Sequence, residues 1–237
     1  MGFNPLSPER ARLMEAVLPH VPFDGWSESA LRAGASDIGM SEFDVRTLCP
    51  RGPVDLAVAA HQAGDAEMAR RLEQADLADM RFRDRVAEAV WLRLASAGDR
   101  EIVRRAAALF ALPHLAPEGA KLMWGTADAI WEALGDGSRD ANWYSKRVTL
   151  SAVYSACVLY WLGDESPDAT ATRAFIDRRI EDVMTFEKVK GQLRGSEVLK
   201  PFLRPFEAMM SGVKAPSTSR RDPDVPGYWA PKPGASK

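Results

Sequence analysis

The titratable and nucleophilic side chains of this 237-residue chain form no recognisable catalytic or metal-binding motif. His20, His61 and His114 are far apart in the sequence, and none has the His-x-x-x-His spacing of a helical metal site. The sequence also lacks a Glu-x-x-His pair, a Gly-x-Ser-x-Gly elbow and a phosphate-binding Gly-x-x-x-x-Gly-Lys loop. Cys49 and Cys157 lie in apolar contexts that favour packed thiols in a reducing compartment. We therefore expect no catalytic residue, no bound metal and no cofactor, and hence a protein that is not an enzyme.

Aromatic residues give the most specific pattern in the chain. Trp143 and Tyr144 are adjacent at the start of a predicted helix, just after a Gly-Asp-Gly turn. Neighbouring helical residues point about 100° apart, so both rings cannot sit comfortably in one core. With Ile130 and Trp131 from the preceding helix, they predict an apolar partner-binding patch with a charged rim. The rim comprises Asp136, Asp140, Lys146 and Arg147, of which Arg147 is also expected to bind the partner. The sequence also allows an alternative, in which Trp131 and Trp143 cap the core and only Tyr144 is exposed.

The segment from Gly135 to Met184 resembles the C-terminal domain of the ninth Coq protein family of ubiquinone biosynthesis. The matching features are the acidic turn, the Asn-Trp-Tyr-Ser-Lys-Arg block at 142–147, the helix at 150–154, the Ser-Pro-Asp helix start at 166–168 and the helix at 175–180. The resemblance extends from about Gly25 to Gln192. It implies a TetR-like helical fold, binding of isoprenoid lipid and assistance to the di-iron hydroxylase that acts on demethoxyubiquinone.

Helical periodicity and capping residues run through most of the chain, and no segment alternates with period two for long enough to form a strand. The first helix is expected to begin at Ser7-Pro8-Glu9. The others are expected at 26–39, 42–49, 54–74, 80–97, 100–111, 117–134, 141–162 and 168–193. We therefore predict an all-α, TetR-like helical bundle with a degenerate N-terminal helix-turn-helix and a C-terminal amphipathic helix.

Four segments are predicted along the chain. Residues 1–52 form the helix-turn-helix-like unit and residues 53–194 the helical lipid-binding domain. Residues 195–214 form an amphipathic membrane-contact segment, and the Pro-rich residues 215–237 form a disordered tail.

The stretch Val148–Leu162 holds fifteen residues without a charge, which is short of the roughly 20 needed to span a bilayer. It is therefore expected to be a central helix that is buried all round. Such a helix can pack in a filled core or line a lipid cavity, and the sequence leaves both open. The residues expected to line the cavity are Met123, Leu150, Val153, Tyr154, Val158, Phe175, Ile176, Ile180 and Met184.

The helix-turn-helix pattern near the N-terminus lacks a basic reading face. Ala35, Gly39, Val45 and Leu48 have the spacing of the motif, but the second helix offers Glu42 and Asp44 to a phosphate-lined groove. The formal net charge of the chain is −2, which gives no general attraction to nucleic acid. We expect a structural relic that does not bind nucleic acid.

The C-terminal segment combines an apolar helical face with cationic flanks, a pattern typical of helices at a membrane surface. Docking onto the chain's own core or a second subunit is the alternative, and Pro201 and Pro205 leave the continuity of the helix open. The residues expected at the membrane are Leu199, Phe202, Leu203, Phe206 and Met210. The resembling family also ends in an amphipathic helix that contacts membranes.

The resulting hypothesis is a non-enzymatic, lipid-binding accessory protein of ubiquinone biosynthesis. It would bind isoprenoid or quinone intermediates and present them to the demethoxyubiquinone hydroxylase. We expect a homodimer. We also expect a location in the bacterial cytoplasm, peripherally on the inner membrane. The frequent Ala, Arg, Asp and Gly residues suggest a bacterial source, and the N-terminus lacks the apolar core of a secretion signal. The alternative is a TetR-type transcriptional regulator that senses an apolar ligand.

Overall fold

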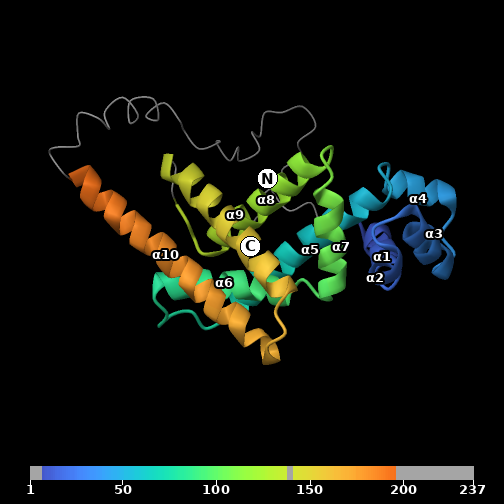
Figure 1. Cartoon of the computed structure of the whole chain (residues 1–237). Coiled ribbons are helices and arrows are strands. Elements are labelled where there is room, and N and C mark those ends of the chain that lie inside the picture. Colours follow the sequence, from blue (N-terminus) through green and yellow to red (C-terminus); the bar gives the residue numbers. More distant parts are fainter. Residues whose placement is uncertain (1–6, 138–140, 196–237) are drawn as a thin grey trace, which may run out of the picture.

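The computed structural model describes residues 7–137 and 141–195, and these form helices without any strand (Figure 1). The all-α prediction is therefore confirmed for this part of the chain. The helices are α1 Pro8–Val17, α2 Val21–Asp24, α3 Glu28–Asp37, α4 Glu42–Leu48, α5 Pro53–Gln74, α6 Phe82–Ala95, α7 Arg100–Phe110, α8 Ala116–Ala133, α9 Ala141–Leu162 and α10 Thr170–Gly195, with a short 3-10 helix, η1 Pro167–Ala169, before α10.

Capping side chains start several helices where the sequence predicts. Ser7, Ser27, Ser41 and Asp99 each accept a hydrogen bond from a backbone N–H in the first turn that follows. The helix α2 was not predicted, because four residues are too few to show a helical period.

The helices pack around two hydrophobic cores. The first core is formed by α1 to α4 and the beginning of α5, and the second by α6, α8, α9, α10 and the rest of α5. Figure 1 shows α1 to α4 as a group at one side, from which α5 leads into the larger group of helices. Leu56 lies in the first core and Met68 in the second, so α5 belongs to both. The predicted boundary between residues 52 and 53 falls at the start of this shared helix.

The helix-turn-helix consists of α3 and α4, joined at Gly39, whose φ of +64° favours glycine. The charges on α4 are taken up locally. Arg46 pairs with Glu42 at 3.1 Å, and the hydroxyl of Ser41 donates to Asp44 at 2.6 Å. Arg46, the basic residue on the second helix of the motif, is therefore already bound to a carboxylate on the same helix.

The C-terminal end of α10 extends away from the other helices in Figure 1. The predicted membrane residues Leu199, Phe202, Leu203, Phe206 and Met210 lie outside the described residues, as does the segment 215–237. Within residues 7–137 and 141–195, no helix is both long enough and apolar enough to cross a membrane.

Candidate functional site

The helix α7 has a strongly apolar face but contains no fully buried residue. Ile102, Val103 and Phe110 on that face are only half-buried, although their spacing predicts an inward-facing stripe. Ile102 and Phe110 pack against the first core and Val103 against the second, and part of the face between them borders a space that the protein does not fill.

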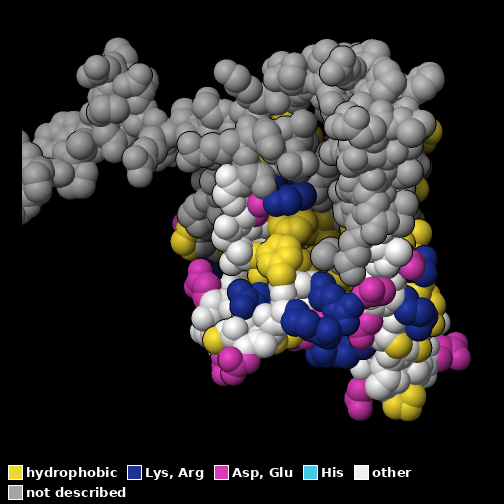
Figure 2. Space-filling model, turned by 90° about the vertical axis from the view of Figure 1, so that its left-hand side faces the viewer, with side chains coloured by type: hydrophobic (Ala, Val, Ile, Leu, Met, Phe, Trp, Pro, Cys, Tyr) yellow, Lys and Arg dark blue, Asp and Glu magenta, His cyan; other side chains and the backbone are white. Residues whose placement is uncertain are grey.

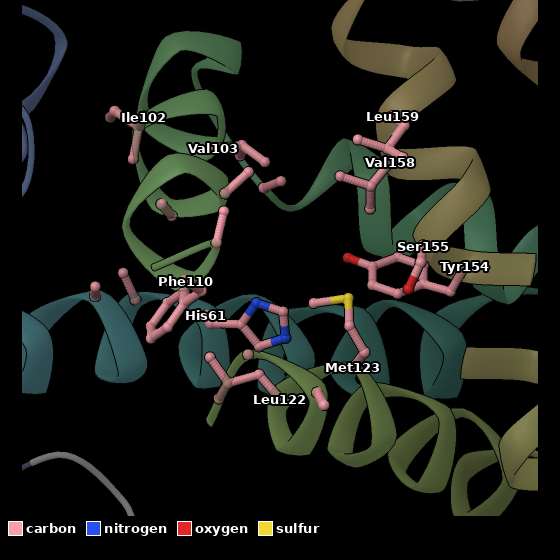
Figure 3. Close-up of a pocket in the computed structure, with 18 of the residues that line it drawn as sticks. His61, Ile102, Val103, Phe110, Leu122, Met123, Tyr154, Ser155, Val158 and Leu159 are labelled. Atoms are coloured by element: carbon pink, nitrogen blue, oxygen red, sulfur yellow. The ribbon is translucent and has the colours of Figure 1, made fainter. Parts of the chain in front are cut away.

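That space is a cavity of about 320 Å³, which we call the α7 cavity. It is lined by α7 and by α5, α6, α8 and α9, and its labelled residues His61, Val103, Met123 and Val158 surround a common space in Figure 3. Trp26 and Ala57 of the first core and Leu94 of the second core also line it. The cavity therefore lies where the two cores meet, which is a common place for a ligand site, and its volume is at the lower end of roughly 300–1,000 Å³ for such sites.

The lining is mostly apolar, and one side of it reaches the protein surface. Leu159 of α9 is 69% exposed, and Ala107 and Ala120 of α7 and α8 are exposed as well. Tyr154, one helical turn before Val158, is 2% exposed. The cavity thus has an open side near Leu159 and a closed end near Tyr154.

Arginine side chains on α7 bond to carbonyl groups of neighbouring segments. Arg104 donates to the carbonyl of Leu162 at 2.9 Å, Arg105 donates to that of Pro22 at 2.9 Å, and Arg100 donates to that of Asp164. These contacts attach α7 to α2 and to the end of α9, while Ile102 and Phe110 pack against the first core and stay half-buried.

A buried ion pair stands at the closed end of the cavity. Arg93 donates from Nε to Asp65 at 2.5 Å and from a terminal nitrogen to the carbonyl of His61 at 3.0 Å. Thr126 donates to the same carboxylate at 2.8 Å, and its hydroxyl lies 2.8 Å from His61 Nε2. Both charges are more than nine-tenths buried, so each depends on the other. We call His61, Asp65, Arg93 and Thr126 the polar network.

Gly64 leaves the room that Arg93 occupies. A Cβ atom at position 64 would lie 2.8 Å from a terminal guanidinium nitrogen, which is too close for an unshifted side chain. The glycine in the middle of α5 is thus explained by the approach of the arginine from α6.

Burial sets the protonation of the two titratable rings beside the cavity. Burial, assisted by the charge of Arg93, lowers the pKa of His61 to about 4. Burial raises the pKa of Tyr154 to about 12. At neutral pH the imidazole is uncharged and the phenol keeps its proton.

The residues predicted to line one lipid cavity fall into three groups. Met123, Tyr154 and Val158 line the α7 cavity. Leu150, Val153 and Ile180 border a second hollow. Phe175 and Ile176 lie in neither hollow. The ring of Phe175 stacks on that of Tyr160 with ring centres 4.2 Å apart, and Ile176 is buried in the second core. The side chain of Met184 lies outside the described residues.

The second hollow, of about 260 Å³, lies between α6, α9 and α10. Phe82 and Trp131 stack in its wall with ring centres 5.9 Å apart. Figure 2 shows hydrophobic side chains gathered on the side of the molecule that faces left in Figure 1, with Lys and Arg side chains beside them. The residues predicted to line one lipid cavity are therefore divided mainly between this hollow and the α7 cavity.

Sequence reasoning missed the contributions of α5, α6 and α7 to the α7 cavity. The apolar stripe of α7 was visible, but periodicity shows only that a face is apolar and not what it meets. The glycine at position 64 and an arginine inside the apolar stripe of α6 were the available signals for a buried polar group.

The predicted partner patch needs correction. Ile130 is completely buried, Trp131 is 8% exposed and Arg147 is 2% exposed, so none of them is presented at the surface. Ile130 and Trp131 face the second core because α8 packs closely on α9. Trp143 and Tyr144 are half-buried.

Trp143 and Tyr144 contact one another and a third ring. Their ring centres lie 4.7 Å apart, and Trp124 of α8 lies 5.8 Å from Trp143 and 6.2 Å from Tyr144. We call these three residues the aromatic cluster. Trp124 was not predicted, although it is a half-buried tryptophan at the same junction of α8 and α9.

Of the charged residues expected at the rim of the patch, Asp140 lies outside the described residues, and the other three instead join α8 to α9. Arg147 pairs with Asp128 and, at 3.3 Å, with Asp136, while Lys146 pairs with Asp136 at 2.6 Å. The guanidinium of Arg147 also lies 4.0 Å from the ring centre of Trp143. The acidic turn thus positions the aromatic cluster through Arg147.

Within residues 7–137 and 141–195, no three His, Cys, Asp or Glu side chains are grouped closely enough to hold a metal ion. Cys49 and Cys157 are buried and unpaired, and burial raises the pKa of both thiols.

Comparisons with known proteins place this geometry in a family context. Residues 116–187, which include α8, α9 and most of α10, match the sequence model of the family described as COQ9. The human "Ubiquinone biosynthesis protein COQ9, mitochondrial" is 29% identical over 197 residues, covering 78% of this chain and 60% of the human protein. The relative from Drosophila melanogaster is 30% identical over 199 residues, covering 78% and 58%. The relative from Schizosaccharomyces pombe is 28% identical over 191 residues, covering 79% and 75%. The resemblance to this family is therefore confirmed, and the chain spans about 60% of the length of the human relative.

A solved structure supports the fold. The TetR transcriptional regulator from Nitrosomonas europaea superimposes with a TM-score of 0.62 and 19% sequence identity, covering 74% of this chain and 97% of that one. The fold is thus TetR-like, as the sequence predicts.

The low pKa of His61 predicts a pH-dependent stability. Because the unfolded chain binds a proton to this ring near pH 6.5 and the folded chain only near pH 4, the free energy of unfolding falls as the pH falls through this window. The loss attributable to His61 is about 2 kcal/mol between pH 7 and pH 5. Urea unfolding at both pH values measures it.

The substitution His61→Gln should remove this part of the pH dependence, because Gln cannot be protonated. The matched substitution His114→Gln, at an exposed position, should leave the pH dependence intact. If His61→Gln and the unsubstituted protein lose the same stability between pH 7 and pH 5, the imidazole is not held neutral by burial.

Proposed function

We propose that this chain is a non-enzymatic accessory protein of ubiquinone biosynthesis that binds an isoprenoid or quinone lipid in the α7 cavity. The observation that carries the proposal is the apolar, half-buried face of α7 across an open-sided cavity of about 320 Å³. The names of the COQ9 relatives support the pathway, and the family match at residues 116–187 covers two of the cavity walls, α8 and α9.

The physical need for such a protein follows from the chemistry of polyprenyl lipids. Each buried methylene group is worth about 0.8 kcal/mol, so a long isoprenoid tail does not leave a bilayer unaided. An apolar cavity replaces the lost lipid contacts for the part of the molecule that enters it. The apolar side chains of Val103, Met123 and Val158 supply those contacts here.

The proposal includes presentation of the lipid to the di-iron demethoxyubiquinone hydroxylase. The aromatic cluster of Trp124, Trp143 and Tyr144 is the surface proposed to bind that enzyme, because half-buried aromatic rings make strong interface anchors. Met123, which lines the cavity, is followed directly by Trp124 in the aromatic cluster. The lipid site and the proposed docking surface therefore share one stretch of α8.

The proposal further includes contact of the segment 195–214 with a membrane surface, a homodimer, and a location on the inner membrane of a bacterium. The apolar face with cationic flanks in that segment supports the membrane contact. A DNA-binding regulator is the less favoured function, because Glu42 and Asp44 lie on α4 and Arg46 is paired with Glu42.

Filling the α7 cavity should displace the lipid. Val158→Trp places a large ring among half-buried lining residues, so we expect loss of most co-purified lipid with little change in melting temperature. Native mass spectrometry and a thermal melt measure the two effects. The same substitution at Val148, which is 58% exposed on the same helix, is the control and should retain lipid.

A tightly filled site would respond differently. Overpacking would then cost about 1–3 kcal/mol of stability without releasing lipid. A low melting temperature with lipid retained in Val158→Trp would therefore contradict the proposed cavity.

Removing one ring of the aromatic cluster should weaken binding to the hydroxylase. Because an aromatic anchor commonly contributes about 2 kcal/mol or more, Tyr144→Ala should reduce affinity for the purified enzyme roughly thirtyfold. Titration by calorimetry or interferometry measures the affinity, and a thermal melt checks the fold. Tyr160→Ala on the same helix removes a ring that stacks on Phe175 instead, and should bind normally. Equal affinities for the two variants would rule out the aromatic cluster as the docking surface.

A further inference from the structure

Tyr154 carries a polar group that the protein itself does not use. The residue as a whole is 2% exposed, and its hydroxyl takes part in no hydrogen bond among the residues that the structure describes. The hydroxyl oxygen is not among the fully enclosed polar atoms that lack a partner, because it borders the cavity. Figure 3 shows this hydroxyl pointing into the α7 cavity, on the side where His61 and Met123 lie. A hydroxyl that faces a cavity and has no protein partner is available to a ligand atom that enters the cavity, in place of water.

The charges near this hydroxyl are already compensated. Arg93 lies with its guanidinium 5.7 Å from the Tyr154 ring centre, but it is bound to Asp65 and to the carbonyl of His61. The nearby Ser155 hydroxyl donates to the carbonyl of Ser151 at 2.8 Å. The polar network therefore has no net charge while His61 is neutral, and it offers no uncommitted cation to an anionic ligand.

The protonation state fixes the role of the hydroxyl. Burial raises the pKa of Tyr154 to about 12, so the group keeps its proton and can donate a hydrogen bond to an oxygen atom. A carboxylate or phosphate brought to this point would be desolvated without a free counter-charge, which is costly. An uncharged oxygen such as a quinone carbonyl pays a much smaller desolvation cost.

We propose that the Tyr154 hydroxyl is the hydrogen-bond donor that selects ligands with an uncharged oxygen-bearing head group and holds that head at the closed end of the α7 cavity. This proposal rests on the proposed lipid-binding function and adds the orientation of the lipid and the class of head group. The head lies near Tyr154 and the polar network. The apolar tail leaves past Val158 toward exposed Leu159, because a cavity of about 320 Å³ cannot enclose a long polyprenyl chain.

Three probes of equal tail length test the selection in the full chain after removal of bound lipid. They are 2-decyl-1,4-benzoquinone, decylbenzene and 4-decylbenzoate, which carry a neutral oxygen head, no polar head and an anionic head. The unsubstituted protein should bind the quinone most tightly and the benzoate most weakly. Quenching of tryptophan fluorescence, checked by calorimetry, gives the affinities.

Tyr154→Phe removes only the hydroxyl. One hydrogen bond predicts that this variant binds the quinone about 3- to 10-fold more weakly, while its affinity for decylbenzene is unchanged. Tyr160→Phe, on the same helix but outside the cavity lining, is the matched control and should behave as the unsubstituted protein. The variant should fold normally, because the hydroxyl makes no bond within the described residues.

An infrared measurement tests the same bond without any variant. The carbonyl stretch of the bound quinone should move to lower frequency relative to the quinone in a hydrocarbon solvent, because the phenol donates to it. An unshifted carbonyl band would overturn the proposal even if the variant failed to fold.

The outcomes separate the two proposals. Binding of decylbenzene together with equal quinone affinity in Tyr154→Phe would leave the lipid cavity standing and overturn the role of the hydroxyl. Binding of 4-decylbenzoate as tight as that of the quinone would overturn the selection for a neutral head. Failure of all three probes to bind would overturn the lipid-binding function and this inference with it.

Discussion

The buried ion pair of Arg93 and Asp65 is the interaction on which the arrangement of the site depends. It joins α6 to α5, and Thr126 extends it to α8. Separating the two partners would leave a buried charge uncompensated, which typically costs about 3–5 kcal/mol, so the helices must keep the two groups together. The helix α7 is held differently, by arginine contacts with backbone carbonyls and without a fully buried residue. A rigid wall opposite an incompletely buried helix leaves a hollow between them.

The position of this hollow connects the fold to the proposed activity. It lies at the junction of the two cores, and α8 and α9 supply both part of its lining and the aromatic cluster. The TetR-like architecture thus provides a cavity next to an aromatic surface, while Arg46 on the second helix of its helix-turn-helix is paired with Glu42. The same fold can serve a lipid carrier or a regulator, so the function is argued from the site and from the COQ9 relatives.

Much of the fold could be predicted from the sequence, because helix starts depend on local residues such as Ser27 and Asp99. The site could be predicted only in part. Helical periodicity identified the apolar face of α7, but whether that face meets a core or a cavity depends on α5, α6 and α9. The same limit applies to Arg147, which was expected at the surface and instead pairs with Asp128 and Asp136. Which charges pair across a turn depends on how closely α8 packs on α9.

The central claim is that the α7 cavity holds a neutral amphiphilic lipid. Mass spectrometry of the organic extract from the purified full chain tests it most directly, with the protein expressed in cells that make ubiquinone. The account predicts a prenylated quinone or a neutral precursor, enriched over bulk membrane lipid and present in an amount close to one molecule per cavity. An extract that contains no lipid, or only phospholipids in the proportions of the host membrane, would contradict it.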